Sequence, residues 1–299
     1  MQQERDVLAV AWFIRILGIG EDRNFAKGKP PMKLTPMTIN LRYGTANDGE
    51  YVWENRHPVM IEMLREYHPD IFSVQEGLRF QLDELIEALP GYACFGEGRD
   101  ELDKGEHVAI FYNVRRLYCI EGSSFWLSET PEIPGSKSWD SGHSRSVTWG
   151  RFQQKTTGVP FYFYNTHFDN HSELARQQSA KLVWNRVHLS KEITFFTGDF
   201  NCNEQSFAWQ YLTGKIDLDE RGDFTDVWHA AEEQRNPVST YHGYRGPREA
   251  NVRIDWILMR PELRVLKAET VVYQRDGMYP SDHFPVYAEV EMPTEREKT

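Results

Sequence analysis

The sequence predicts an α/β (α+β) fold in which two mostly antiparallel sheets pack face to face, with helices on their outer faces. Apolar segments of strand length recur along the 299 residues, and helical periodicity separates them in only some places. Elsewhere strand follows strand, which is typical of packed sheets rather than a parallel α/β sheet. The residues are 40% hydrophobic and 13% aromatic, enough for a broad β core. We therefore expect a four-layer α-β-β-α sandwich.

In the first part of the predicted domain, strands alternate with helices along the chain. A strand is expected at 38–42. Trp53 and Met60 begin a helical periodicity that Pro69 ends, which predicts a helix over 53–68. A buried strand over 70–75 ends at Glu76, and a second helix over 79–89 is closed by Pro90-Gly91. Further strands are expected at 107–112, 116–120, 145–153, 160–166, 193–197, 253–259, 264–273 and 284–291, with helices at 172–190 and 204–213.

The chain divides into a main domain and two short ends. Residues 1–36 read as an N-terminal extension, helical or partly disordered, whose last part (21–36) is a charged, Pro-rich linker. The main domain is expected over 37–292, followed by a charged tail at 293–299. An apolar stretch after Val7 is interrupted by Arg15, and no run of about 18 uncharged apolar residues predicts a spanning helix.

The net charge and the cysteine content argue against several classes of protein. The formal net charge of −11 argues against a protein that tracks long nucleic acid by charge. Three cysteines without a CxxC pair predict neither a disulfide framework nor a zinc site. A cytoplasmic location is expected. Secretion or membrane contact through the apolar N-terminal segment is the alternative, and no stable protein partner is implied.

Polar side chains recur where apolar strands end. Asn40, Glu76, His167 and Asp199 each follow such a strand, and Asp255 lies inside one. A single Asn or Asp there is explained by a turn or helix cap, and a single His by a local hydrogen bond. A carboxylate within an apolar strand is costly unless it is paired or bound to a metal. Together these residues indicate a shared polar site.

Three later segments supply groups that suit metal-assisted attack on a phosphate. They are Gly198-Asp199-Phe200-Asn201, Arg253-Ile254-Asp255-Trp256 and Ser281-Asp282-His283. Each places a carboxylate beside a second polar group. Such chemistry needs oxygen ligands for a hard cation, a base, and a group that holds the attacking water.

In this order the motifs resemble the endonuclease/exonuclease/phosphatase superfamily, which includes DNase I, exonuclease III-type repair nucleases, deadenylases, and inositol-polyphosphate and sphingomyelin phosphodiesterases. The resemblance covers roughly 37–292 and implies a DNase I-like fold. It is closest to a bacterial-type branch of uncharacterised members related to the deadenylase-like group. The patterns of that branch are matched at 40–44, 125–131 (Phe-Trp-Leu-Ser-Glu-Thr-Pro), 165–169 and 240–244 (Thr-Tyr-His-Gly-Tyr).

The resemblance implies a Mg²⁺ site, with Mn²⁺ as a substitute. Glu76 would be the main ligand, with Asn40 and Asp282 nearby. Asp199 would act as general base or hold the attacking water, and Asn201 would orient that water or the phosphate.

The remaining roles are also implied by the family. His283, oriented by Asp255, and His167, paired with Glu106, would contact the phosphate from two sides. Arg42 replaces the acidic residue of repair nucleases and is expected to contact phosphate. Arg145 is a candidate for the same task, with a surface ion pair as its alternative. Asp169, which opens a long helix, is interpreted as a capping or supporting residue.

We therefore expect a Mg²⁺-dependent phosphoesterase that hydrolyses a phosphodiester or phosphomonoester by direct attack of water. One alternative is a 3′-5′ exoribonuclease of the deadenylase kind. Another is a phosphatase or phosphodiesterase of a small sugar, inositol or lipid head-group ester, which fits the net charge better. A non-catalytic binding module is the remaining alternative, although every ligand position is filled.

Overall fold

A computed structural model describes residues 32–100, 104–248 and 252–293 of the chain. The N-terminal extension and the C-terminal tail expected from the sequence lie outside these residues, apart from 32–36 and 293. No helix in the described ranges is long and apolar enough to cross a membrane.

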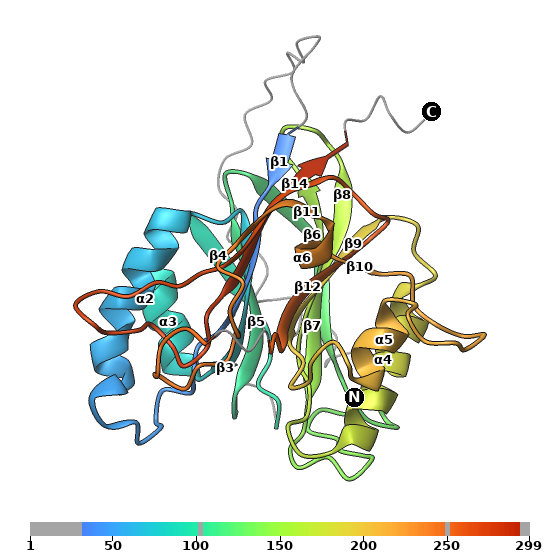
Figure 1. Cartoon of the computed structure of the whole chain (residues 1–299), viewed down its shortest axis with the longest axis horizontal. Coiled ribbons are helices and arrows are strands. Elements are labelled where there is room, and N and C mark those ends of the chain that lie inside the picture. Colours follow the sequence, from blue (N-terminus) through green and yellow to red (C-terminus); the bar gives the residue numbers. More distant parts are fainter. Residues whose placement is uncertain (1–31, 101–103, 249–251, 294–299) are drawn as a thin grey trace, which may run out of the picture. The chain divides into compact units, whose positions relative to one another are not determined.

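The first sheet contains both parallel and antiparallel strand pairs (Figure 1). Its central strands β2 and β3 are parallel, as are β11 and β13, and the other pairs are antiparallel. Along the sheet the order is β11 (Ala231–Arg235), β13 (Val265–Thr270), β14 (Val286–Met292), β2 (Pro36–Asn40), β3 (Ile71–Gly77), β5 (His107–Asn113) and β4 (Tyr92–Phe95), while β1 (Met32–Leu34) also pairs with β14.

The second sheet repeats the same plan around one parallel pair, β8 and β9. Its other neighbours are antiparallel. The order is β10 (Thr225–Asp226), β12 (Asp255–Arg260), β9 (Ile193–Asp199), β8 (Pro160–His167), β7 (Ser146–Gln154) and β6 (Leu117–Trp126). Helix α2 connects the parallel strands β2 and β3, and helix α4 connects β8 and β9, as a parallel crossover requires. The parallel strands β11 and β13 are instead connected through β12 of the second sheet.

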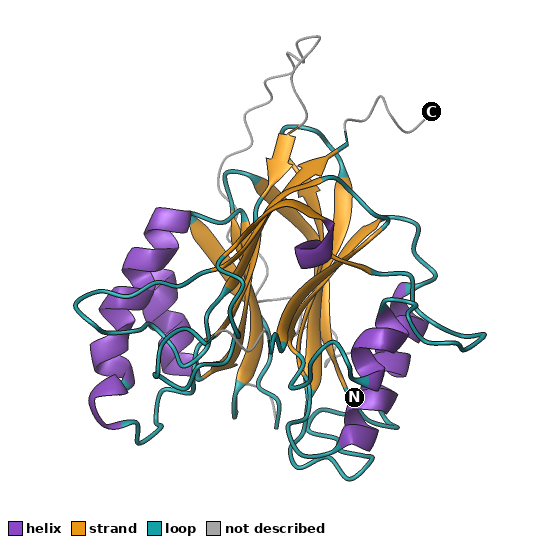
Figure 2. Ribbon diagram, viewed as in Figure 1, coloured by secondary structure: helices purple, strands orange, loops and turns teal. Residues whose placement is uncertain are grey.

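The four longest helices cover the outer faces of the two sheets (Figure 2). Helices α2 (Trp53–Tyr67) and α3 (Arg79–Ala88) pack on the first sheet, where Met60, Leu85 and Phe72 share one buried cluster. Helices α4 (Glu173–Val187) and α5 (Phe207–Leu212) pack on the second sheet. A third cluster, with side chains from both sheets, fills the space between them. The predicted four-layer α-β-β-α sandwich is confirmed.

The short elements differ most from the sequence prediction. Strand β1 forms within the expected linker. It pairs with β14, and its residue Leu34 is buried. The predicted helix over 204–213 begins only at Phe207, where the Ser206 hydroxyl accepts a hydrogen bond from Trp209 N. Polar or very short segments gave no periodic signal. They are β4, β10, β11, the 3-10 helix η1 (Gly49–Tyr51) and helix α6 (Val227–Ala230).

Buried polar side chains connect the two sheets close to the strand ends. Gln75 Nε2 donates to Asn165 Oδ1 at 2.7 Å. Asn165 Nδ2 in turn donates to the carbonyl oxygens of Val74 and Ala109 at 2.8 and 2.9 Å. Buried polar groups are costly unless they are paired. The network therefore fixes how one sheet is positioned against the other.

Replacing Asn165 by alanine is expected to lower the free energy of unfolding by about 2–3 kcal/mol, because it leaves buried partners of the amide unpaired. Urea denaturation measures this change. Gln153→Ala, which removes a partly exposed amide on β7 that bonds Gly158 O, is the control and is expected to change stability little. Equal stabilities of the two variants would contradict this account of the sheet interface.

Candidate active site

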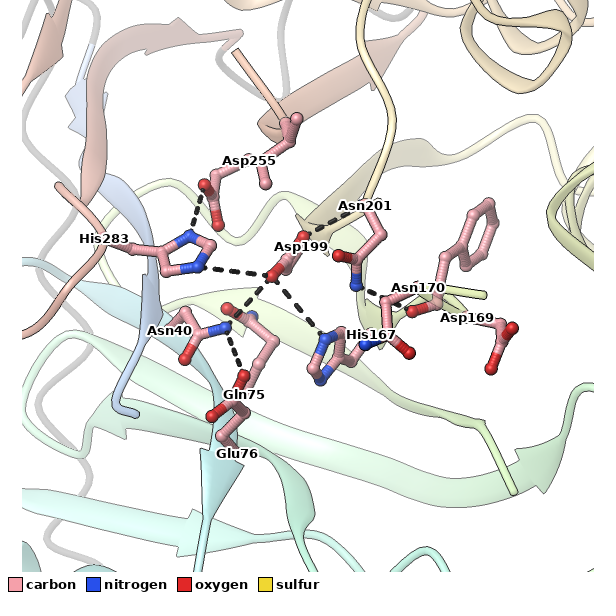
Figure 3. Close-up of polar contacts among 12 residues, drawn as sticks. Asn40, Gln75, Glu76, His167, Asp169, Asn170, Asp199, Asn201, Asp255 and His283 are labelled. Carbon is pink, nitrogen blue, oxygen red and sulfur yellow. Dashed lines mark hydrogen bonds and ion pairs between the residues drawn. The ribbon is translucent and has the colours of Figure 1, made fainter. Parts of the chain in front are cut away.

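Strand ends from both sheets bring the sequence-predicted polar residues to one place (Figure 3). Asn40 and Glu76 come from the ends of β2 and β3 in the first sheet. His167 and Asp199 end the parallel strands β8 and β9 in the second sheet, directly opposite each other in the register. Asp255 begins β12, paired with Asp199, and His283 precedes β14.

Asp199 lies at the centre of this group. Its Oδ2 atom accepts a hydrogen bond from Asn40 Nδ2 at 3.0 Å and lies 3.6 Å from His167 Nε2 and 3.9 Å from His283 Nε2. Its Oδ1 atom accepts from Asn201 N at 2.9 Å. Burial first, and then the charge of Asp255, raise the pKa of Asp199 to about 7. A carboxylate with that pKa suits a general base near neutral pH.

Asp255 and His283 form a buried ion pair. The imidazole Nδ1 lies 2.9 Å from Asp255 Oδ2, as the family resemblance implied. Burial disfavours the charged ring, but the carboxylate of Asp255 and then that of Asp199 raise the pKa of His283 well above its usual value. His283 is therefore an imidazolium near neutral pH, with its Nε2 turned toward Asp199.

His167 differs from His283 in its protonation state. Burial, followed by the charges of Arg145 and Arg99, lowers the pKa of His167 well below the usual value for histidine. The ring is therefore neutral at pH 7. The two histidines that flank Asp199 thus differ in charge, because Asp255 offsets the burial of His283, whereas Arg145 and Arg99 add to the effect of burial on His167.

Glu106 does not pair with His167, contrary to the family-based prediction. Its Oε2 atom lies 2.6 Å from Arg99 Nη1, and no hydrogen bond joins it to His167 within the described part of the chain. A permanently charged guanidinium is a stronger partner for a carboxylate than a neutral imidazole. Arg99 was missed because it lies in a loop with no periodic or motif signal.

Glu76 and Asp282 supply oxygen atoms that suit a divalent cation. Glu76 accepts from Asn40 Nδ2 at 3.0 Å and from Tyr43 N at 3.1 Å. The pKa of Asp282 is raised, by burial and also by the charge of Glu76. Two acidic groups that repel each other at one cavity are a fitting environment for a hard cation. Next to Asp282, the Ser281 hydroxyl donates to Asn40 O at 2.6 Å and closes the site.

Asn40 is turned so that its amide nitrogen bridges Glu76 and Asp199. Its Oδ1 atom accepts a hydrogen bond from Arg42 N at 2.9 Å. The structure thus gives Asn40 a positioning role between two carboxylates, and its role as a metal ligand stays a prediction.

Asp199, Asp255 and His283 form a second group of side chains that could hold a metal ion, because one possible ligand atom from each lies within 4.8 Å of the others. However, His283 Nδ1 is bound by Asp255, and the ring is charged. A protonated imidazole cannot be a metal ligand. The charge state of His283 therefore suits proton transfer better than metal binding at this cluster, and a cation at Glu76 and Asp282 stays a prediction.

The two arginines predicted to contact phosphate lie in different surroundings. Arg42 donates to both carboxylate oxygens of Asp48, each at 2.8 Å, so its planar fork is already occupied. Arg145 is only 4% exposed, which rules out the surface ion pair considered from the sequence. Its Nη2 atom donates to Asn170 Oδ1 at 3.2 Å.

Asp169 and Asn201 hold the chain around the site. Asp169 Oδ1 accepts from the backbone N–H groups of His171 and Ser172 at the start of α4, as the capping interpretation predicted. Burial opposes its ionisation, but backbone hydrogen bonds, that of Ser172 first, lower the pKa of Asp169 to about 2. Asn201, with a φ of 50°, donates from Nδ2 to Phe168 O at 3.0 Å.

A cavity of about 390 Å³ opens onto these groups. Its lining includes Glu76, Asp199 and His283, and also Arg99, Arg145 and His143. This volume falls at the small end of the range for small-molecule sites.

Comparison with known proteins supports the same chemistry. A model of the endonuclease/exonuclease/phosphatase family matches residues 37–283. A solved protein of that family from Bacteroides thetaiotaomicron is 33% identical, with a TM-score of 0.82 over 88% of this chain and 96% of that one. A mannosyl-6-phosphatase from the same organism is also 33% identical, with a TM-score of 0.79 over 87% and 100%. The human Nocturnin catalytic domain shares the fold at 16% identity, with a TM-score of 0.65 over 86% and 94%.

Asp255→Asn is expected to lower the pKa of His283, because the substitution removes the negative charge that favours the imidazolium. NMR titration of the histidine ring measures this shift. We expect kcat/KM at neutral pH to fall with it. Asp219→Asn, which removes an exposed carboxylate, is the control. An unchanged titration of His283 in the Asp255 variant would disprove the assigned charge state.

Proposed function

Because this chain belongs to the endonuclease/exonuclease/phosphatase family, whose members are hydrolases of phosphoester bonds, we propose that it hydrolyses a small phosphate monoester with the help of a divalent cation. The observation that carries this proposal is the cavity of about 390 Å³, which contains the acidic and histidine side chains together with a buried arginine. A cavity of this size suits a small ester better than an extended polymer.

In the proposed reaction, Asp199 accepts a proton from the attacking water. Its pKa of about 7 leaves a large fraction ionised at neutral pH, and the ring of His283 lies 3.9 Å from its Oδ2 atom. Asn201, whose backbone N–H donates to Asp199 Oδ1, would orient the water or a phosphate oxygen. A base within reach of the water contributes about 10²- to 10⁴-fold to the rate.

Charge that develops on the phosphate would be stabilised by groups already oriented in the site. The His283 imidazolium, fixed by Asp255, donates through Nε2, and His167 approaches from the other side of Asp199. Preorganised donors act without reorganisation during the reaction. Glu76 and Asp282, with Asn40, would hold the cation, for which we propose Mg²⁺ with Mn²⁺ as a substitute. Such a cation supplies Lewis-acid stabilisation of the phosphoryl oxygens.

The nature of the substrate is supported by charge and by similarity. The net charge of −11 disfavours a nuclease that depends on a long polyanion. A 33% identical solved structure that spans 87% of this chain is named as a mannosyl-6-phosphatase, so a sugar phosphate is our preferred substrate class. A deadenylase-like nuclease is the second candidate, but the likeness to Nocturnin at 16% identity concerns the fold alone. No protein partner is required by this proposal.

A panel of sugar phosphates, p-nitrophenyl phosphate, bis-p-nitrophenyl phosphate and short RNA, assayed with Mg²⁺ or EDTA, tests the proposed function. We expect metal-dependent turnover that is fastest on a monoester. Asp199→Asn should reduce kcat by about 10²- to 10⁴-fold, because the base is lost. Glu192→Gln, which breaks an ion pair with Arg151, is the matched control. RNA as the preferred substrate would favour the nuclease instead.

Binding of the cation can be tested without turnover. Mg²⁺ or Mn²⁺ should raise the thermal midpoint of the parent protein and EDTA should reverse it, since a ligand that binds only the folded state stabilises it. Glu76→Gln should abolish most of this shift. A Glu76 variant that keeps the full shift would move the cation site elsewhere.

A further inference from the structure

We propose that Arg99 and Arg145 form a paired-guanidinium subsite that binds the terminal oxygens of a phosphate monoester and thereby selects monoesters over diesters. The inference rests on the proposed function and deepens it. It assigns a role to Arg99, and it gives residues 125–131, whose pattern stood out in the sequence, a place in the site as the support of both arginines.

Arg145 is a buried cation without a close counterion. Its side chain is 4% exposed, and its ion-pair partner among the described residues, Asp169, places a carboxylate oxygen 3.8 Å from Nε, beyond hydrogen-bond distance. Its Nε and Nη1 atoms have no hydrogen-bond partner among the described residues. Burying an uncompensated charge is costly. Because Arg145 lines the active-site cavity, an anion bound there would supply the missing partner.

Arg99 lines the same cavity as Arg145, and its Nε atom also lacks a hydrogen-bond partner within the described ranges. Its Nη1 atom is held by Glu106 at 2.6 Å, which fixes the orientation of the guanidinium. Its carbonyl oxygen accepts from Trp126 Nε1 at 2.6 Å and from the Ser144 hydroxyl at 2.9 Å. Two side-chain donors on one loop carbonyl hold this residue firmly in place.

Residues 125–131 connect the two arginines. Trp126 donates its indole N–H to Arg99, and the next residue, Leu127, donates its backbone N–H to Arg145 O at 2.7 Å. The segment is itself closed by a hydrogen bond from Trp126 N to Pro131 O at 2.8 Å. Trp126 and Leu127 are both buried. Two consecutive residues therefore fix the backbones of two arginines that lie 46 positions apart in the sequence.

The carboxylates nearby leave Arg145 available to a ligand. Glu106 is engaged by Arg99, and Asp169 accepts backbone N–H groups of His143, His171 and Ser172. A phosphate monoester offers three non-bridging oxygens and up to two negative charges, whereas a diester offers two oxygens and one charge. Guanidinium groups bind such oxygens in a bidentate manner. The oxygen that only a monoester possesses is the one we assign to Arg99 and Arg145.

Binding of inorganic phosphate tests the subsite independently of turnover. Isothermal titration calorimetry of the full chain with Mg²⁺ is expected to show about tenfold to hundredfold weaker phosphate binding in Arg99→Gln than in the parent, the loss typical of one charge-assisted hydrogen bond. Arg151→Gln, which removes an arginine of β7 that pairs with Glu192, is the matched control and should bind as the parent does. No phosphate binding by the parent, or equal binding by the Arg99 variant, would overturn the subsite.

Selectivity is measured with p-nitrophenyl phosphate and bis-p-nitrophenyl phosphate, which share a leaving group. In Arg99→Gln the ratio of kcat/KM for monoester over diester should fall about tenfold or more. Trp126→Phe, which removes only the indole donor, should shift the ratio in the same direction by less. Arg99→Lys keeps the positive charge and is the conservative comparison. Unchanged thermal midpoints show that the variants fold.

The outcomes separate this inference from the proposed function. Equal losses on both substrates, or a loss on sugar phosphates with none on p-nitrophenyl phosphate, would overturn the subsite while leaving a phosphoesterase. The second result would instead place Arg99 against the leaving group. A parent protein that binds phosphate through Arg99 but hydrolyses no ester would refute the proposed function and leave the subsite standing.

Discussion

The carboxylate of Asp199, buried where strands of both sheets end, is the constraint on which the site depends. A buried acid needs partners, and here each comes from a different strand. Asn40 donates from the first sheet, while His167 and Asp255 lie opposite Asp199 on its two neighbours in the second. A shift of one residue in either register would turn these side chains to the other face. Strand pairing therefore sets the distances as well as the membership of the site.

The two histidines beside Asp199 carry different charges, so the site has a cationic side and a neutral side. On one side Asp255 keeps His283 protonated, and on the other burial, together with the charges of Arg145 and Arg99, keeps His167 neutral. The same kind of side chain thus serves as a cationic donor on one flank and as a neutral one on the other. The polar network of Gln75 and Asn165 behind the site keeps the two flanks in fixed relation.

Much of this arrangement could be predicted from the sequence, because apolar strands followed by polar residues are a local signal. The four layers and the cap made by Asp169 follow from such patterns, whereas the pairing of Asp255 with His283 was implied by the family resemblance. The partner of Glu106 could not be predicted, since it depends on which cation a loop brings near, and Arg99 has no motif of its own. The burial of Arg145 and the rotation of the Asn40 amide are likewise decided by tertiary packing rather than by neighbouring residues.

The hydrogen bond from Ser281 to Asn40 joins positions 241 residues apart. Contacts of such long range carry a large loop-closure cost, and a fold that is rich in them is expected to form slowly. Partly folded species with a single intact sheet would keep regular secondary structure but contain only half of the polar constellation. Recovery of the complete constellation during refolding would thus report global, cooperative assembly, whereas recovery of circular dichroism could precede it.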